Sequence, residues 1–113
     1  MKTKIEQEGD VTIIEFEGHF TLGLGEYKIK RTITDLLNSG ARKILFQFTE
    51  VKFINSAGIG ELVGAYISVS NRGGTIKLCC IPEKVDKMLE VTQLISIFDV
   101  YETREEALAS FKS

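Results

Sequence analysis

Histidine, cysteine and proline are scarce in this sequence, and tryptophan is absent. Its 113 residues include one histidine (His19), two cysteines (Cys79 and Cys80) and one proline (Pro82). Two cysteines and one histidine do not have the spacing of a metal site. No serine or cysteine near His19 stands in the sequence pattern of a catalytic nucleophile. We therefore expect no metal, no cofactor and no enzymatic activity.

Long apolar runs and an excess of positive charge are also missing. No stretch approaches the roughly 20 apolar residues that a membrane helix needs. No apolar run follows a basic N-terminus, as it would in a secretory signal. The formal net charge is −2, whereas proteins that bind nucleic acid usually present a basic face. We expect a soluble, cytoplasmic chain that neither inserts into a membrane nor binds nucleic acid.

The chain length suits one domain built around one hydrophobic core. No internal repeat, linker or low-complexity segment divides the sequence. We therefore predict a single domain over residues 1–113. The sequence leaves the oligomeric state open between a monomer and a weak dimer.

Strand-like and helix-like patterns alternate along the chain. Gly9-Asp10 separates the first two strand-like runs and is typical of a two-residue hairpin turn. The expected elements of the first half are strands at 2–8 and 11–17, a glycine-punctuated loop at 18–25, a helix at 26–38 and a strand at 43–48. Those of the second half are a helix at 56–71, a strand at 75–80, a helix with Pro82 in its first turn, a strand at 97–101 and a last helix opened by the capping box Thr103 to Glu106.

The order of these elements is β-β-α-β-α-β-α-β-α. Strands that alternate with helices after an initial hairpin imply parallel pairing through crossover connections. The sequence therefore predicts an α/β fold with a mixed, mostly parallel sheet, opened by an antiparallel hairpin and packed against helices.

Cys79 and Cys80 are adjacent within the apolar run 76–81. Successive residues of a strand point to opposite faces of the sheet, so we expect the two thiols not to be bonded to each other. Their predicted role is that of two small core residues.

Gly23 and Gly25 lie between a predicted strand and a predicted helix, where a dinucleotide-binding loop would stand. The fingerprint of that loop needs a third glycine at position 28, which is Lys28. A flexible loop explains the glycines better. Binding of a small molecule through this loop is an alternative that the sequence disfavours.

The segment 53–60 (Phe-Ile-Asn-Ser-Ala-Gly-Ile-Gly) joins a strand to a helix. Asn55 or Ser56 therefore falls where an N-cap belongs. Free backbone N–H groups and the positive end of the helix dipole lie there, so the fold would tolerate a phosphate on Ser56. A plain helix cap is the simpler role for this serine. Glycines at 58, 60 and 64 each cost the helix about 1 kcal/mol relative to alanine, which indicates close packing against the sheet or the preceding loop.

The stretch from Val51 to Leu62 resembles the signature of STAS domains, named for sulphate transporters and anti-sigma factor antagonists. The family pattern is an aspartate, a serine, a small residue and then Gly-Leu/Ile-Gly opening a helix. The resemblance extends over nearly the whole chain. Gly18 matches the glycine that ends the second family strand, and residues 89–101 are similar to the late helix and last strand. The resemblance implies a STAS-like fold.

The resemblance also implies a function. Stand-alone family members of this length bind an anti-sigma factor that is also a serine kinase, and phosphorylation of the signature serine reverses the binding. By position that serine is Ser56. The implied partner surface consists of Thr21, Asn55, Ser56, Ala57, Gly58, Ile59, Gly60 and Glu61, and we expect Glu61 to point to solvent.

Two residues depart from the family pattern. The aspartate before the serine is Asn55 here, and the acidic residue common in the earlier loop is Thr21. Both changes remove negative charge from beside Ser56, and the sequence leaves open whether they hinder or favour its phosphorylation. The alternative function is a non-catalytic STAS subunit of a transporter or ATPase assembly, because such a subunit needs no kinase chemistry.

Overall fold

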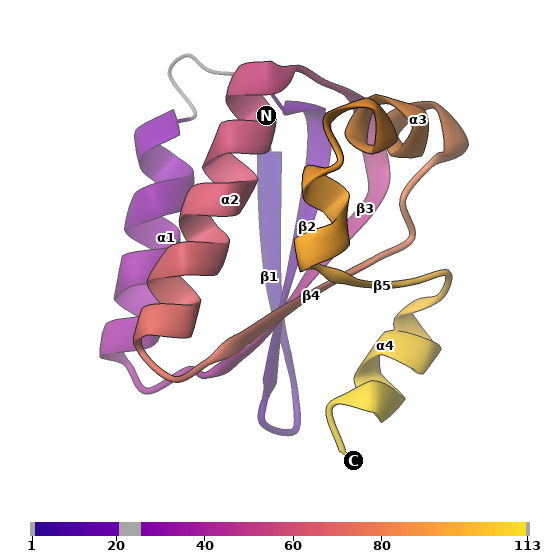
Figure 1. The fold of residues 1–113 in the computed structure, drawn as a ribbon. Helices are drawn as coiled ribbons and strands as arrows, with labels where there is room; N and C mark the ends of the chain where they lie inside the picture. The colour runs from indigo at the N-terminus through magenta and orange to yellow at the C-terminus, as the bar shows by residue number, and fades with distance from the viewer. Residues whose placement is uncertain (1, 21–25, 113) are drawn as a thin grey trace.

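The computed structural model describes residues 2–20 and 26–112. Its elements are β1 (Lys2–Glu8), β2 (Val11–Phe20), α1 (Glu26–Asn38), β3 (Lys43–Ile54), α2 (Ser56–Asn71), β4 (Thr75–Cys79), α3 (Glu83–Thr92), a 3-10 helix (Leu94–Ile97), β5 (Asp99–Tyr101) and α4 (Arg104–Ser110). The five strands form one sheet in the order β1-β2-β3-β4-β5 (Figure 1). β1 and β2 are antiparallel, and every other pair is parallel. The predicted fold class is confirmed.

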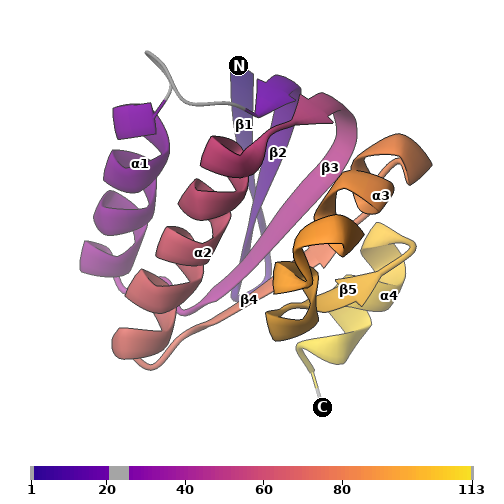
Figure 2. The same cartoon turned by 45° about the horizontal axis from the view of Figure 1, so that its top comes forward.

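Helices cover both faces of the sheet. The larger core cluster joins the sheet to α1, α2 and α3, and α1 and α2 run side by side (Figures 1 and 2). Its centre is a group of fully buried phenylalanines, in which the Phe16 ring lies 5.0 Å from both Phe20 and Phe46, edge to face. A smaller cluster of Val11, Ile13, Leu45, Cys79, Ala107 and Phe111 lies under α4 on the other face.

Two cations fasten α4 to the sheet. The Arg104 guanidinium donates to the carboxylate of Glu6 at 2.8 Å and to the side-chain oxygen of Gln47 at 3.3 Å. The Lys77 ammonium donates to the hydroxyl of Ser110 at 2.8 Å and to its carbonyl at 3.2 Å. The predicted cap of this helix is confirmed, because the Thr103 hydroxyl oxygen accepts the backbone N–H of Glu106 at 3.1 Å.

β2 and β3 are both longer than the sequence predicts. β2 continues through Gly18 to Phe20, where a loop is expected, and β3 continues from Phe48 to Ile54. The parallel ladder between them survives two register shifts, one between Glu15 and Glu17 and one after Gly18. Gly18 has φ +108°, a backbone conformation that favours glycine. The extra pairing carries both strands to the end of the sheet where α2 begins.

Three further boundaries differ from expectation. Residues 94–97 form a 3-10 helix, so the last strand begins at Asp99 and not at residue 97. Pro82 is the N-cap of α3 and not part of its first turn, because its ψ of 146° is extended. β4 ends at Cys79, one residue early, since Cys80 takes a left-handed φ of +59°.

Both cysteines are free thiols. Cys79 is fully buried under α4, and the half-buried Cys80 packs against the same cluster. The expectation that the two residues face opposite sides of the sheet was therefore wrong. Cys80 lies beyond the end of β4, where the left-handed turn interrupts the alternation of a strand.

No helix in the described part of the chain is long and apolar enough to cross a membrane. Within residues 2–20 and 26–112, no three His, Cys, Asp or Glu side chains gather as they would around a metal ion.

Candidate functional site

The site lies where β3 ends and α2 begins, beside the last residue of β2. Asn55 is the N-cap of α2: its backbone is extended, and its side-chain oxygen accepts the N–H of Gly58 at 2.8 Å. Its own N–H donates to the carbonyl of Phe20 at 3.4 Å. The sequence left the cap open between two residues, and the structure assigns it to Asn55.

Ser56 is the first helical residue and is exposed. Because Asn55 supplies the capping oxygen, the hydroxyl of Ser56 is not needed to close the helix. The first turn of α2 contains no acidic side chain, so none of its own residues offsets the positive end of the helix dipole. The hydroxyl is therefore displayed where an added negative charge would be favourable.

The three glycines of α2 have different surroundings. A Cβ on Gly58 would lie 1.9 Å from the Phe20 carbonyl oxygen, so only glycine fits there. A Cβ on Gly60 or Gly64 would meet no heavy atom within 4 Å, and both residues are exposed. The predicted close packing is therefore right for Gly58 and wrong for the other two.

Gly60 and Gly64 lie on the outer face of α2, in line with Ser56 because residues four apart stack along a helix. Ile67 lies on the same face, and its side chain is 51% exposed. We call Ser56, Gly60, Gly64 and Ile67 the outer stripe of α2. Sequence reasoning missed Ile67, because its spacing matches the apolar face. Its position one turn after Gly64 was the signal that could have placed it outside.

Glu61 was expected to point to solvent, and this expectation was wrong. The residue is half-buried, and both of its carboxylate oxygens are shielded from water. Each helical step turns about 100°, so Glu61 stands on the flank of α2 and not on the outer stripe. A partner on that stripe would not meet the Glu61 carboxylate directly.

The remaining predicted partner residues differ in exposure. Gly58 and Ile59 are buried, and Asn55 and Ala57 are half-buried. Ser56 and Gly60 are thus the exposed members of the set that the structure describes. Thr21 and the loop with Gly23 and Gly25 lie outside the described residues.

The ends of β2 and β3 add an aromatic pair beside the loop. His19 and Phe53 are register partners, and their ring centroids lie 5.9 Å apart. His19 is exposed and Phe53 is half-buried. The sequence did not bring these two residues together, because their pairing depends on the extension of both strands.

Comparisons with known proteins bear on the family and the fold. Residues 2–107 match the family model of the STAS domain. A protein of Thermotoga neapolitana, described as a candidate anti-sigma factor antagonist, is 37% identical over 79 residues, which cover 70% of each chain. The crystal structure of a similarly described protein from Thermotoga maritima has a TM-score of 0.89 at 27% identity, covering 98% of this chain and 95% of the other. The Bacillus cell fate determinant SpoIIAA, solved in its phosphorylated form, has a TM-score of 0.73 at 20% identity, covering 97% and 99%, and shows likeness of fold alone.

Proposed function

This chain belongs to the STAS domain family, and on that premise we propose that it is a non-catalytic anti-sigma factor antagonist, switched by phosphorylation of Ser56. Its partner is an anti-sigma factor of the serine-kinase type. The observation that carries the proposal is the position of Ser56, exposed at the first turn of α2 while Asn55 does the capping. Such a regulator acts in the cytoplasm, where sigma factors meet RNA polymerase.

The outer stripe of α2 supplies a contact surface. With no side chain at Gly60 or Gly64, a partner can approach the helix backbone closely, and Ile67 offers an exposed apolar contact at the far end. Ser56 stands at the near end of the same stripe. A residue so placed is both within reach of a docked kinase and at the edge of the contact it controls.

A phosphate on Ser56 would leave the fold intact and change the surface. It adds about −1.5 to −2 charges at neutral pH, and the N-terminus of a helix accommodates such an anion. A partner packed against the stripe would then have to strip water from the charged phosphate, which costs free energy. Release of the partner follows from that desolvation cost.

Two similar proteins support the proposed function. One is described as a candidate anti-sigma factor antagonist, and SpoIIAA, which shares the fold, has been solved in a phosphorylated form. Asn55 stands where the family pattern has aspartate, so Ser56 is recognised here with one carboxylate fewer beside it.

The direct test incubates the protein with an anti-sigma factor kinase from its source genome and Mg-ATP, and follows intact mass. We expect one phosphoryl group per chain, mapped to Ser56 and lost in Ser56→Ala. Ser70→Ala is the matched control, because Ser70 is an exposed serine at the other end of α2. Transfer to another residue, or none with every kinase tried, would refute the switch.

Binding to the partner is measured separately. Ser56→Asp is expected to weaken binding about tenfold or more, as a charge in a desolvated contact does. Ser96→Asp, at an exposed serine outside α2, should leave binding unchanged. Equal affinity of Ser56→Asp and wild type would remove the stripe from the interface.

The second candidate is a STAS subunit of a transporter or ATPase assembly. Asn55 favours it, because a docking subunit needs no carboxylate to assist a kinase. Purification from native cells separates the two functions: a sigma-regulating kinase accompanies the protein in one case, and a membrane-associated ATPase in the other.

A further inference from the structure

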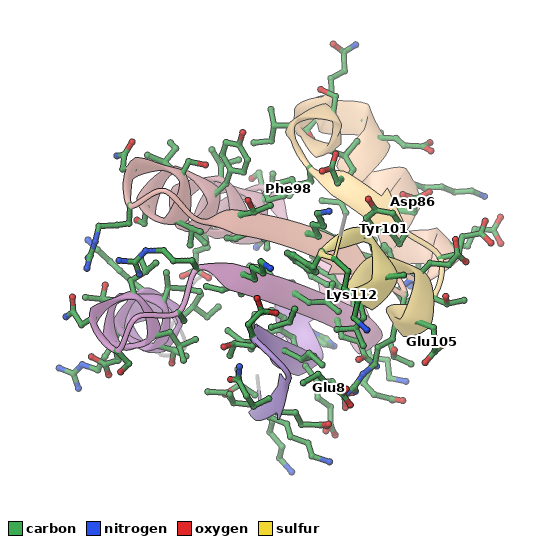
Figure 3. All side chains as sticks on the ribbon, turned by 90° about the horizontal axis from the view of Figure 1, so that it is seen from below. Glu8, Asp86, Phe98, Tyr101, Glu105 and Lys112 are labelled. Atoms are coloured by element: carbon green, nitrogen blue, oxygen red, sulfur yellow. The ribbon has the colours of Figure 1, made fainter. Side chains whose placement is uncertain are left out.

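Among residues 2–20 and 26–112, β1 forms an edge of the sheet to which no further strand is paired. The strand pairs with β2 on one side, and the strand order starts with β1. In Figure 3 the β1–β2 hairpin, marked by Glu8, lies at the lower margin of the sheet. An edge strand presents backbone N–H and C=O groups that can pair with another strand. β1 has seven residues and β5 at the opposite edge has three, so β1 is the longer edge.

The hairpin turn determines which backbone groups face outward. Glu8 and Val11 flank the two-residue turn and are register partners, and Gly9 in the turn has φ +59°. The pair that closes such a turn exchanges both of its hydrogen bonds, and bonded and non-bonded pairs then alternate along the ladder. The residues of β1 whose N–H and C=O groups point away from β2 are therefore Thr3, Ile5 and Gln7.

The charge of the side chains along β1 changes from positive to negative at the centre of the strand. Lys2 and Lys4 precede Ile5, and Glu6 and Glu8 follow it. Ile5 itself is 50% exposed. An antiparallel copy of the same strand centred on Ile5 would pair Lys2 with Glu8, Thr3 with Gln7, Lys4 with Glu6 and Ile5 with its own counterpart. Every charged residue would then face an opposite charge.

Other registers lack this complementarity. Centring the pair on Lys4 sets two lysines opposite each other, and centring it on Glu6 sets two glutamates opposite each other. Centring on Thr3 pairs Lys2 with Lys4. Like charges directly opposite in a sheet are destabilising. The charge pattern therefore selects the register in which Ile5 lies on the two-fold axis.

We propose that β1 is a self-association edge, which pairs antiparallel with β1 of a second copy of this chain about a two-fold axis at Ile5. The contact is isologous, as in most homodimers, and joins two five-stranded sheets into one. The outward N–H and C=O groups of Thr3, Ile5 and Gln7 would all be bonded. A single strand pair is a small interface, so the dimer forms reversibly with concentration.

This association uses none of the residues through which the proposed partner switch operates. Failure of either proposal therefore leaves the other standing. Arg104 holds Glu6 at 2.8 Å and lies farther from Glu8, at 3.9 Å. Tests that exchange charges are therefore placed on Lys2 and Glu8, where the existing ion pair is the weaker one.

Sedimentation velocity of the 113-residue chain at low salt, from about 10 µM to about 1 mM, tests the proposal. Wild type is expected to shift from monomer to dimer over this range. Ile5→Pro removes an N–H that points outward and leaves the ladder to β2 intact, so it should remain monomeric with unchanged circular dichroism. Ile5→Val keeps the N–H and the branched side chain, and should dimerise like wild type.

A charge exchange tests the register and does not depend on how proline is tolerated. Lys2→Glu and Glu8→Lys should each weaken self-association about tenfold. An equimolar mixture of the two should restore it, since opposite charges then face each other at both ends. The proposal is overturned by a wild type that stays monomeric, by an Ile5→Pro variant that dimerises normally, or by a mixture no stronger than its components.

Discussion

The carbonyl oxygen of Phe20 occupies the space that a side chain on Gly58 would need. A Cβ on Gly58 would lie 1.9 Å from that oxygen and 2.8 Å from its carbon. The same carbonyl accepts the N–H of Asn55 at 3.4 Å. The last residue of β2 thus fixes where α2 starts, and with it where Ser56 is displayed.

Two glycine substitutions should have opposite effects on stability. Gly58→Ala forces backbone against backbone, and overpacking of this kind costs about 1–3 kcal/mol or more. Gly60→Ala meets no atom within 4 Å and should raise stability by about 1 kcal/mol, the helix propensity difference. Urea unfolding measures both free energies. A stable Gly58→Ala protein would contradict the packing of α2 against β2.

The Gly60→Ala variant also separates the stability of the free protein from its binding to a partner. If the outer stripe contacts a partner, Gly60→Ala should weaken partner binding although the free protein becomes more stable. Unchanged binding would show that the partner does not approach the backbone at Gly60.

Sequence patterns predicted the features that depend on neighbours in the chain. The capping threonine at 103, the turn at Gly9-Asp10 and the start of α2 are local signals, and the structure has all three. Local patterns could not distinguish the tightly packed glycine of α2 from the exposed ones. Gly58 differs from Gly60 only through a contact with another strand, and no local pattern records that contact.

The ends of β2 and β3 show the same limit. Their last residues pair only because two register shifts and the left-handed Gly18 keep the ladder together. Glu61 was expected to point to solvent as part of the partner surface that the resemblance implies, but its place on the flank of α2 shields its carboxylate. The rotation about the helix, which decides the exposure of a single residue, is not recorded in the motif.

Asn55 should contribute to stability through its cap. Asn55→Ala removes the acceptor for the Gly58 N–H and should cost about 1 kcal/mol. Asn55→Asp keeps the acceptor and adds a charge near the helix N-terminus, worth about 0.3–1 kcal/mol. Thermal unfolding at neutral pH compares the variants. A destabilised Asn55→Asp protein would show that the loop repels a carboxylate.

Acid should loosen the attachment of α4. The hydrogen bond from Arg104 lowers the pKa of Glu6 below its ordinary value of 4.5. A lowered pKa in the folded state means that this contribution is present above pH 4.5 and is lost as the pH falls through the folded value. Urea unfolding from pH 6 to pH 3 should show a shallower decline for Arg104→Ala than for wild type.

Part of the decline should remain in Arg104→Ala, because Lys43 lowers the pKa of Asp10 in the same direction. Arg72→Ala is the matched control, since the Arg72 guanidinium bonds to the Asn38 side chain and not to a carboxylate. Identical pH profiles for Arg104→Ala and wild type would contradict the role of the Glu6 pair.

The two thiols should differ in reactivity, although they are adjacent. Cys79 is fully buried under α4, and burial raises the pKa of its thiol above the ordinary value of 9.0. Only the thiolate reacts with a disulfide reagent. In Cys80→Ser the remaining thiol should therefore be modified at the rate of unfolding, whereas in Cys79→Ser the half-buried Cys80 should react faster. The raised pKa also implies that the neutral thiol stabilises the fold below about pH 9 and that this contribution declines at higher pH. If the thiol of Cys80→Ser were modified as fast as that of Cys79→Ser, at a rate independent of urea, the result would contradict this prediction. It would mean that α4 leaves the sheet far more often than its contacts with Glu6 and Ser110 imply.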